Sequence, residues 1–253
     1  QGNDQVTVVV SGLTLSVNAL ADPDIICEGE QSQLDAIVTG GTGTNSYSWI
    51  SDPPGFTSNI ANPVVNPTIT TTYTVTVDDG LETQSDNVTV NVNPNPTANA
   101  GPDEAICIGE CTTLTAAGGI SYIWNNQQTD ASINVCPTNT TTYIVTVTDI
   151  NGCTNSDDVT VTANPRPQAD AGADTEICLG DCTTLNASGG VTYLWNNQET
   201  NATIDVCPII TTIYIVTVTD INGCTDSDDV SVTVNPLPQA DAGADAELCL
   251  GDC

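Results

Sequence analysis

The sequence predicts an all-β fold in which small β-sandwiches follow one another in an extended rod. Thr, Val, Asn, Asp and Gly dominate the 253 residues and Phe occurs once, a composition that favours strands and turns over helices. Apolar residues alternate with polar ones over short stretches bounded by Gly, Asn and Pro, as in half-buried strands. The same pattern returns at a fixed distance along the chain, which is typical of a repeat protein.

Cysteine and tryptophan residues mark the repeat. The four cysteines of one copy return 71 residues later in the next: Cys107, Cys111, Cys136 and Cys153 correspond to Cys178, Cys182, Cys207 and Cys224. Trp124 likewise returns as Trp195, and Cys27 and Trp49 belong to a diverged earlier copy. We expect five segments: 1–18 as the last strand of a preceding repeat, 19–93 as the diverged repeat, 94–164 and 165–235 as two closely similar repeats, and 236–253 as the first strand of a following repeat.

The strands of one copy can be assigned in order along residues 97–163. Alternating apolar residues, with Leu114 facing the core, predict the first strands, and Gly118-Gly119 makes the turn after them. Trp124 falls on the next strand at a core position, as do Trp49 and Trp195 in the other copies. The expected strands are 98–106, 112–116, 122–124, a short strand within 126–131, 133–135, 143–147 and, after the turn at Ile150-Asn151-Gly152, 159–161.

Each linker between copies contains two prolines in four residues: Asn93-Pro94-Asn95-Pro96, Asn164-Pro165-Arg166-Pro167 and Asn235-Pro236-Leu237-Pro238. Proline fixes φ and favours an extended path, whereas a Gly/Ser linker would be flexible. The linkers therefore predict a semi-rigid rod.

The order of the segments AGPDEAICIGECTTLTAAGG, YIWNN and INVCPTNTTTYIVTVTDINGC resembles the PKD-like or immunoglobulin-like repeats of giant cell-surface proteins of the Bacteroidetes. The resemblance covers nearly the whole chain, most clearly residues 97–235. It implies immunoglobulin-like sandwiches in an extracellular protein that the type 9 secretion system exports as an adhesin or a gliding-associated filament. The first copy departs from the pattern, because Gly80-Leu81 stands where the others have Gly-Cys and an insertion surrounds Pro53-Pro54-Gly55-Phe56.

Sandwich topology limits how the cysteines pair. Cys111 begins one strand and Cys136 ends another at the same pole, so we expect Cys111–Cys136 and, in the next copy, Cys182–Cys207. The joint absence of both cysteines in the first copy, which has Gln31 and Asn66 there, is what a pair predicts.

Cys107 and Cys153 are expected at opposite poles of one sandwich, too far apart for a disulfide. The top of each sandwich adjoins the bottom of the one before, so we favour interdomain bonds, Cys27–Cys153 and Cys107–Cys224, with Cys178 pairing beyond Cys253. Two alternatives stay open: an intradomain Cys107–Cys153 bond that leaves Cys27 free, and pairing between neighbouring chains.

Acidic and amide side chains gather in the turns expected near the top pole, and calcium prefers six to eight oxygen ligands from such residues. The candidates are Asp149, Asn151, Asp157 and Asp158 in one copy and Asp220, Asn222, Asp228 and Asp229 in the next. The spacing differs from that of an EF-hand loop. We favour the alternative that these residues are turn formers on a solvated acidic surface. No cofactor is then required, and Ca2+ is the metal such turns would bind.

Charge excludes several function classes. The chain has 32 acidic residues, one basic residue and no histidine, giving a formal net charge of −31. This excludes a basic groove for nucleic acid and a polybasic membrane patch, and no apolar run approaches the ~18 residues of a membrane helix. The lack of Lys and His also excludes a Schiff base and a His-based triad, so we expect no enzyme.

We therefore expect the structural shaft of an extracellular fibre or cell-surface adhesin, stapled by disulfides and bearing load. Eleven cysteines indicate an oxidising, extracellular setting. The expected partners are other copies of the chain in a homo-oligomeric filament, and a glycan or cell-surface target reached through a separate tip. The alternative is that the repeats themselves bind glycans or a cell surface.

Overall fold

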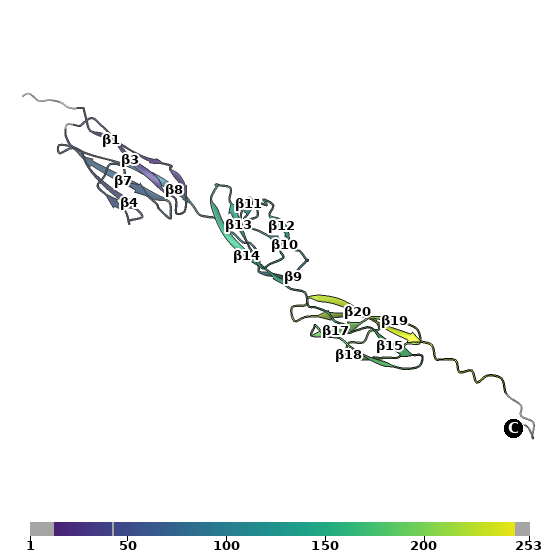
Figure 1. Cartoon of the computed structure of the whole chain (residues 1–253). Helices are drawn as coiled ribbons and strands as arrows, with labels where there is room; N and C mark the ends of the chain where they lie inside the picture. Colours follow the sequence, from purple (N-terminus) through teal and green to yellow (C-terminus); the bar gives the residue numbers. More distant parts are fainter. Residues whose placement is uncertain (1–12, 42, 246–253) are drawn as a thin grey trace, which may run out of the picture. The chain divides into compact units, whose positions relative to one another are not determined.

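A computed structural model of the protein describes residues 13–41 and 43–245, and all of their helix or strand structure is β-strand (Figure 1). The all-β fold predicted from the sequence is confirmed. The described strands form three pairs of sheets, one pair for each repeat of the sequence, so that immunoglobulin-like sandwiches follow one another in tandem.

The first sandwich has a three-stranded sheet, β1-β3-β6, and a five-stranded sheet, β2-β8-β7-β4-β5. The strands are β1 (Ser16–Asp22), β2 (Ile25–Cys27), β3 (Ser32–Thr39), β4 (Ser46–Asp52), β5 (Thr57–Ser58), β6 (Val64–Val65), β7 (Thr71–Asp78) and β8 (Thr83–Asn93). β1 pairs antiparallel with β3, whereas β2 runs parallel to β8. The chain thus changes sheets between β1 and β2.

The expected boundary after residue 18 falls inside β1. Ser16 pairs with Thr39 and Asn18 with Ile37, so residues 16–18 belong to the first sandwich. The alternation continues upstream of the boundary: Leu15 and Ala19 are buried and Val17 is half-buried between them. The expected last strand of a preceding repeat falls mostly on residues 1–12, which lie outside the described residues.

The second and third sandwiches each combine a four-stranded with a two-stranded sheet, in the orders β11-β13-β14-β9 with β10-β12, and β15-β20-β19-β17 with β16-β18. The strands of the second are β9 (Glu104–Cys107), β10 (Thr112–Thr115), β11 (Ser121–Trp124), β12 (Ser132–Val135), β13 (Thr141–Thr148) and β14 (Thr154–Asn164). Those of the third are β15 (Thr175–Cys178), β16 (Thr183–Asn186), β17 (Thr192–Trp195), β18 (Thr203–Val206), β19 (Thr212–Thr219) and β20 (Thr225–Asn235).

Two expected strands of the second sandwich differ from the structure. No strand forms within 126–131, because Gln127 adopts a φ of 71° and the chain turns back there, with the amide of Trp124 donating to the carbonyl of Gln128. The strand expected at 98–106 reduces to an isolated bridge at Asn99 and the short β9. Gly101-Pro102 separates the two, since proline lacks the amide that a ladder needs.

Each sandwich is built around one tryptophan. Trp49, Trp124 and Trp195 are at most 1% exposed, and their indole nitrogens donate to the carbonyl oxygens of Ile60, Asp130 and Asn201 over 3.0–3.1 Å. Alternate residues of the neighbouring strands complete the cores, for example Val75 and Val77 in the first and Val216 and Val218 in the third. The expected core position of these tryptophans agrees with the structure, and the buried N–H is satisfied in every case.

The described residues divide into two compact units that differ from the repeats. One contains the described residues up to Pro102, with Thr113–Ile133 and Tyr143–Val159. The other contains Asp103–Thr112, Asn134–Thr142 and the described residues from Thr160 onward. The division runs through the second repeat, so each junction between consecutive repeats lies inside one unit. The repeat boundaries at 93/94, 164/165 and 235/236 stay predictions.

Candidate functional site: the junctions between repeats

Four disulfides form among the described residues. Two lie within repeats and join the residue before one strand to the residue after another: Cys111–Cys136, with Cα atoms 4.2 Å apart, and Cys182–Cys207, at 4.1 Å. The other two link consecutive repeats, Cys27–Cys153 and Cys107–Cys224. Of the pairings left open by the sequence, the structure thus contains the interdomain set.

The first junction joins the end of β2 to the turn between β13 and β14. The Cα atoms of Cys27 and Cys153 are 5.5 Å apart, a usual spacing for a disulfide. Asn95 of the linker donates from Nδ2 to the carbonyl oxygen of Glu28 over 3.2 Å, and Asn155 donates to that of Pro96 over 2.9 Å. Amide side chains therefore hold the proline-rich linker to both repeats.

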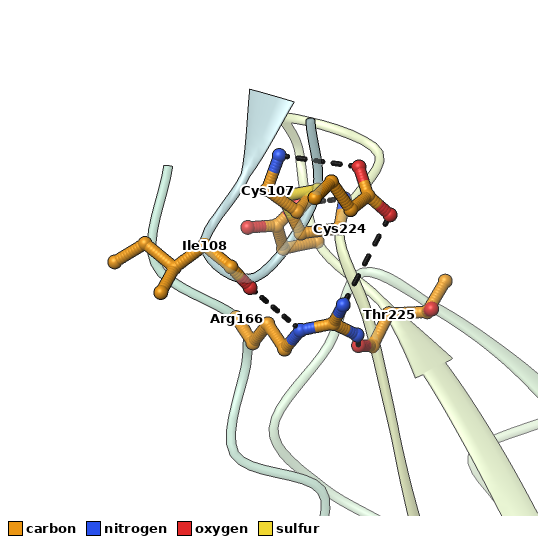
Figure 2. A network of polar contacts seen from close by, with 7 residues as sticks. Cys107, Ile108, Arg166, Cys224 and Thr225 are labelled. Atoms are coloured by element: carbon orange, nitrogen blue, oxygen red, sulfur yellow. Dashed lines mark hydrogen bonds and ion pairs between the residues drawn. A yellow bond between two sulfur atoms is a disulfide. The ribbon is translucent and has the colours of Figure 1, made fainter. Parts of the chain in front are cut away.

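The second junction has the same disulfide geometry but a charged linker residue. Cys107 and Cys224 have Cα atoms 5.6 Å apart, and Arg166 lies beside them (Figure 2). Its guanidinium donates from Nε to the carbonyl oxygen of Ile108 over 3.0 Å and from Nη1 to that of Thr225 over 3.1 Å. Nη2 lies 4.0 Å from a carboxylate oxygen of Glu110, a loose and half-exposed ion pair. The chain's one basic side chain thus bridges the two repeats by hydrogen bonds to backbone carbonyls.

An aspartate positions each turn cysteine. Asp149 Oδ1 accepts from the backbone amides of Asn151 and Cys153 over 2.9 and 2.8 Å, and Asp220 holds Cys224 in the same way, over 2.8 Å. A carboxylate that accepts two amide hydrogen bonds fixes the tight turn. Cys153 and Cys224 are at most 1% exposed, so the turn cysteine of each interdomain disulfide is buried.

Further aspartates fasten the irregular segment that precedes β9 and β15. Asp157 and Asp228 accept from the amides of Ala100 and Ala171 over 2.8 Å. In the opposite direction, Asp103 accepts from the amide of Thr160 over 2.8 Å, and Asp174 does the same for Ser231. The carboxylates supply acceptors where the broken strand leaves amides without ladder partners.

These contacts do not assemble the candidate calcium ligands into a site. Nowhere in the described part of the chain do three or more His, Cys, Asp or Glu residues gather as a metal site would require. Asp149 and Asp220 face their own turns, and Asp157 and Asp228 face backbone amides. Asp158 and Asp229 are the next residues along the same strands, so their side chains project from the opposite face. The expected set of Asp149, Asn151, Asp157, Asp158, Asp220, Asn222, Asp228 and Asp229 is therefore not brought together.

The first repeat has aromatic packing where the others have an intradomain disulfide. Phe56 of the insertion packs edge-on against Tyr73, with ring centroids 5.5 Å apart. The two rings line a cavity of about 380 Å3. Pro53, Asn66 and Ile69 also line it, and none of its lining residues is charged. Burial raises the pKa of the Tyr73 hydroxyl, and the hydrogen bond with Thr71 acts in the opposite direction.

Cys178 is the last residue of β15, the position that Cys27 and Cys107 hold in their own strands. Its exposed thiol forms no disulfide with any described residue. The partner expected for it lies beyond Cys253, and Cys249 and Cys253 themselves fall outside the described residues. The junction role of Arg166 was not predicted from the sequence. The available signal was the single cation of an acidic chain placed inside a linker.

No family model matches the chain, and no curated protein matches it. Among solved structures, three immunoglobulin domains of titin, I67–I69, align over 87% of this chain and 99% of theirs, with 13% identity and a TM-score of 0.42. A bacterial ice-binding adhesin of 1.5 MDa aligns over 88% and 99%, with 16% identity and a TM-score of 0.32. A Ca2+-stabilised adhesin of an Antarctic bacterium aligns over 90% and 75%, with 18% identity and a TM-score of 0.37. Likenesses at this level carry no argument about function.

Proposed function

We propose that the chain is part of the structural shaft of an extracellular fibre or cell-surface adhesin, in which each repeat is covalently stapled to the next. The supporting observation is the pair of interdomain disulfides, Cys27–Cys153 and Cys107–Cys224. Both follow one rule: the cysteine that ends the parallel edge strand of one repeat bonds to the turn cysteine of the next.

The bonds shorten the covalent route along which tension travels. From Cys27 to Cys224 the backbone runs through 197 residue steps (224 − 27). Through the disulfides the route needs only four steps from Cys107 to Cys111 and seventeen from Cys136 to Cys153. At about 3.4 Å per step, and with the Cα–Cα distances of the three disulfides included, the fully extended lengths are about 670 Å and about 90 Å. A chain built in this way limits its own extension even after its sandwiches unfold.

The chemistry of the chain supports an extracellular location. Four disulfides among the described residues require an oxidising compartment. No helix long and apolar enough to cross a bilayer occurs in the part of the chain that the structure describes. The finer assignment, a giant Bacteroidetes protein exported by type 9 secretion that bundles with other copies and carries a separate tip, rests on the sequence resemblance and is part of the proposal.

Peptide mapping of the secreted protein under non-reducing conditions tests the stapling. The proposal expects one disulfide-linked peptide pair containing Cys27 and Cys153 and another containing Cys107 and Cys224. A peptide pair joining Cys107 to Cys153 would remove the interdomain bond and with it the covalent shaft. Blocking free thiols before digestion prevents exchange with Cys178.

A second candidate is glycan binding by the first repeat, and the uncharged cavity beside Phe56 favours it. A neutral sugar avoids the repulsion that an anionic ligand would meet on this acidic surface. Binding of the chain to a glycan array that the Phe56→Ala variant loses would support this candidate. An array without signal for either protein would dismiss it.

A further inference from the structure

The end of strand β15 has the same local structure as the strand ends at the two stapled junctions. At each of the three, the residue three positions after the cysteine donates its amide to the cysteine carbonyl over 2.9–3.0 Å: Glu30 to Cys27, Glu110 to Cys107 and Asp181 to Cys178. The residue directly after the cysteine donates to the last residue of the neighbouring parallel strand, as Leu179 does to Asn235 over 2.9 Å. The third end is therefore folded like the two that carry an interdomain disulfide, although its own cysteine is unbonded within the described part of the chain.

Exposure distinguishes this end from its counterpart at the second junction. Residues 106–108 of the second repeat are buried or half-buried. In the corresponding segment of the third repeat Ile177 is half-buried, whereas Cys178 and Leu179 are exposed. Leu237 of the adjoining linker is exposed as well. Apolar side chains and a thiol thus lie uncovered where the second repeat has a bonded neighbour, which indicates a docking surface.

The two stapled junctions show what covers such an end. In both, the strand cysteine is bonded to the last residue of a turn with the sequence Asp-Ile-Asn-Gly-Cys, residues 149–153 and 220–224. The partner that fits the end of β15 is therefore a turn of this sequence whose cysteine is free. Cys153 and Cys224 are themselves bonded, so a second copy of the chain cannot supply the turn from its second or third repeat.

The first repeat cannot supply the turn either, because Glu82 stands in the place of the turn cysteine. The amide of Asp79 donates to the carbonyl of Glu82 over 3.1 Å, as the amide of Asp149 does to that of Cys153 over 2.9 Å. Asp79 Oδ1 also accepts from the amide of Glu82 over 2.8 Å, the bond that Asp149 makes with Cys153. Glu82, and not Leu81, is thus the structural counterpart of the cysteine, and a carboxylate forms no disulfide.

We propose that the end of the third repeat, with Cys178, Leu179 and Leu237, is a docking surface for an Asp-x-Asn-Gly-Cys turn, and that Glu82 bars the first repeat from filling it. The occupant is the turn of the repeat that residues 236–253 are expected to begin, because at both earlier junctions the linker leads into the repeat that supplies the turn. The stapled series therefore has a direction and a first member, and copies of the chain do not join end to end by disulfides. This inference rests on the proposed stapling of repeats and adds a rule for the choice of partner.

The bond forms by thiol–disulfide exchange with a disulfide oxidant such as oxidised glutathione. The thiolate of one cysteine attacks the oxidant, and one glutathione leaves. The thiolate of the second cysteine then attacks the protein sulfur of the mixed disulfide and releases the second glutathione. Two protein thiols are oxidised, one glutathione disulfide is reduced, and the two protons pass to the leaving thiolates.

Pairing between two full-length proteins in reduced and oxidised glutathione, with about 150 mM NaCl to screen the acidic surfaces, tests the proposal. In the first protein, Cys249→Ser and Cys253→Ser leave Cys178 as the one cysteine outside the four disulfides. In the second, residues 79–82 are replaced by Asp-Ile-Asn-Gly-Cys, and Cys178, Cys249 and Cys253 are all changed to Ser. We expect a disulfide-linked heterodimer, with Cys178 joined to the grafted turn in the peptide map.

A matched control separates docking from chance pairing of thiols. Asn62→Cys, in place of the graft, puts a cysteine at an exposed position of the first sandwich without the turn. The grafted protein should form at least tenfold more heterodimer than this control, because docking raises the effective concentration of the two thiols. Equal yields, or a homodimer of the first protein through Cys178 that equals the heterodimer in yield, would overturn the proposal.

The peptide maps also keep this test separate from that of the shaft. A grafted protein that retains Cys27–Cys153 has a folded first repeat. If it lacks that bond, Glu82→Cys, which keeps the length of the turn, takes the place of the graft. Absence of the heterodimer with both interdomain bonds present contradicts the docking rule alone. Absence of those bonds from the unaltered chain contradicts the shaft and the docking rule together.

Discussion

The guanidinium of Arg166 donates from Nε to the carbonyl oxygen of Ile108 over 3.0 Å. Through this bond and the one from Nη1 to Thr225, the linker holds the end of one repeat against the turn of the next, directly beside the Cys107–Cys224 disulfide. A planar guanidinium is suited to this because its donors diverge toward two acceptors at once. The only cation of the chain thus acts mainly on neutral backbone groups.

Arg166→Ala should lower the free energy of unfolding by about 1 kcal/mol, since both bonds are partly exposed to water. Arg166→Lys should restore little of this, because one ammonium group lacks the forked geometry. Glu110→Gln should cost less than about 0.5 kcal/mol, because its ion pair is long and half-exposed. Urea unfolding measures all three, and an equal loss from Glu110→Gln and Arg166→Ala would contradict the role of the carbonyls.

Removal of an interdomain disulfide should destabilise the chain. Cys107→Ser combined with Cys224→Ser opens a closed segment of 117 residues, for which a loss of about 2–4 kcal/mol is expected. Cys178→Ser is the control, because this thiol forms no disulfide with a described residue, and it should change stability by less than about 0.5 kcal/mol. Thermal unfolding by calorimetry compares them, and a double variant as stable as the control would refute the staple.

Asp228, which holds the irregular segment of the third repeat, should contribute more to the free energy of unfolding than its neighbour Asp229. Asp228→Ala leaves the amide of Ala171 without its acceptor and should cost about 1–3 kcal/mol. Asp229→Ala removes the same charge one residue later, from an exposed position, and should stay within about 0.5 kcal/mol. Hydrogen exchange at Ala171 should accelerate in the first variant alone. Similar acceleration in both would show that charge, not the hydrogen bond, is responsible.

The buried Tyr73 should make the first sandwich sensitive to alkali. Its pKa is raised above the ordinary value of 10.0 in the folded state, so the unfolded chain loses this proton first. The contribution to stability is therefore complete below pH 10 and is lost as pH rises through the raised pKa. Between pH 9 and 11, Tyr73→Phe should flatten the decline in melting temperature, with Cys178→Ser in both proteins to prevent disulfide exchange. Parallel declines with and without Tyr73 would dismiss this cause.

Features that depend on repetition and on the poles of a sandwich were accessible from the sequence. The tryptophan on the third strand of a repeat predicted the core. Cys107 and Cys153 were expected at opposite poles of one sandwich, which favoured pairing each of them with a cysteine of a different repeat. The route of the linker was not accessible, because the contacts of Arg166 depend on backbone angles that two prolines restrict but do not specify. The bond between Asp228 and Ala171 joins residues 57 apart. Neither period nor propensity reports such a contact, which explains why these aspartates were considered as metal ligands.

Stretching single molecules from both ends, before and after reduction, tests the covalent shaft most directly. Once all sandwiches have unfolded, the oxidised chain should be about 600 Å shorter than the reduced one, because the disulfides replace 197 residue steps between Cys27 and Cys224 by 21. Cys27→Ser should recover part of that length without a reducing agent. A difference of only about 170 Å, which the 50 residue steps closed by the intradomain disulfides Cys111–Cys136 and Cys182–Cys207 give by themselves, would contradict the account, since no disulfide would then link one repeat to the next.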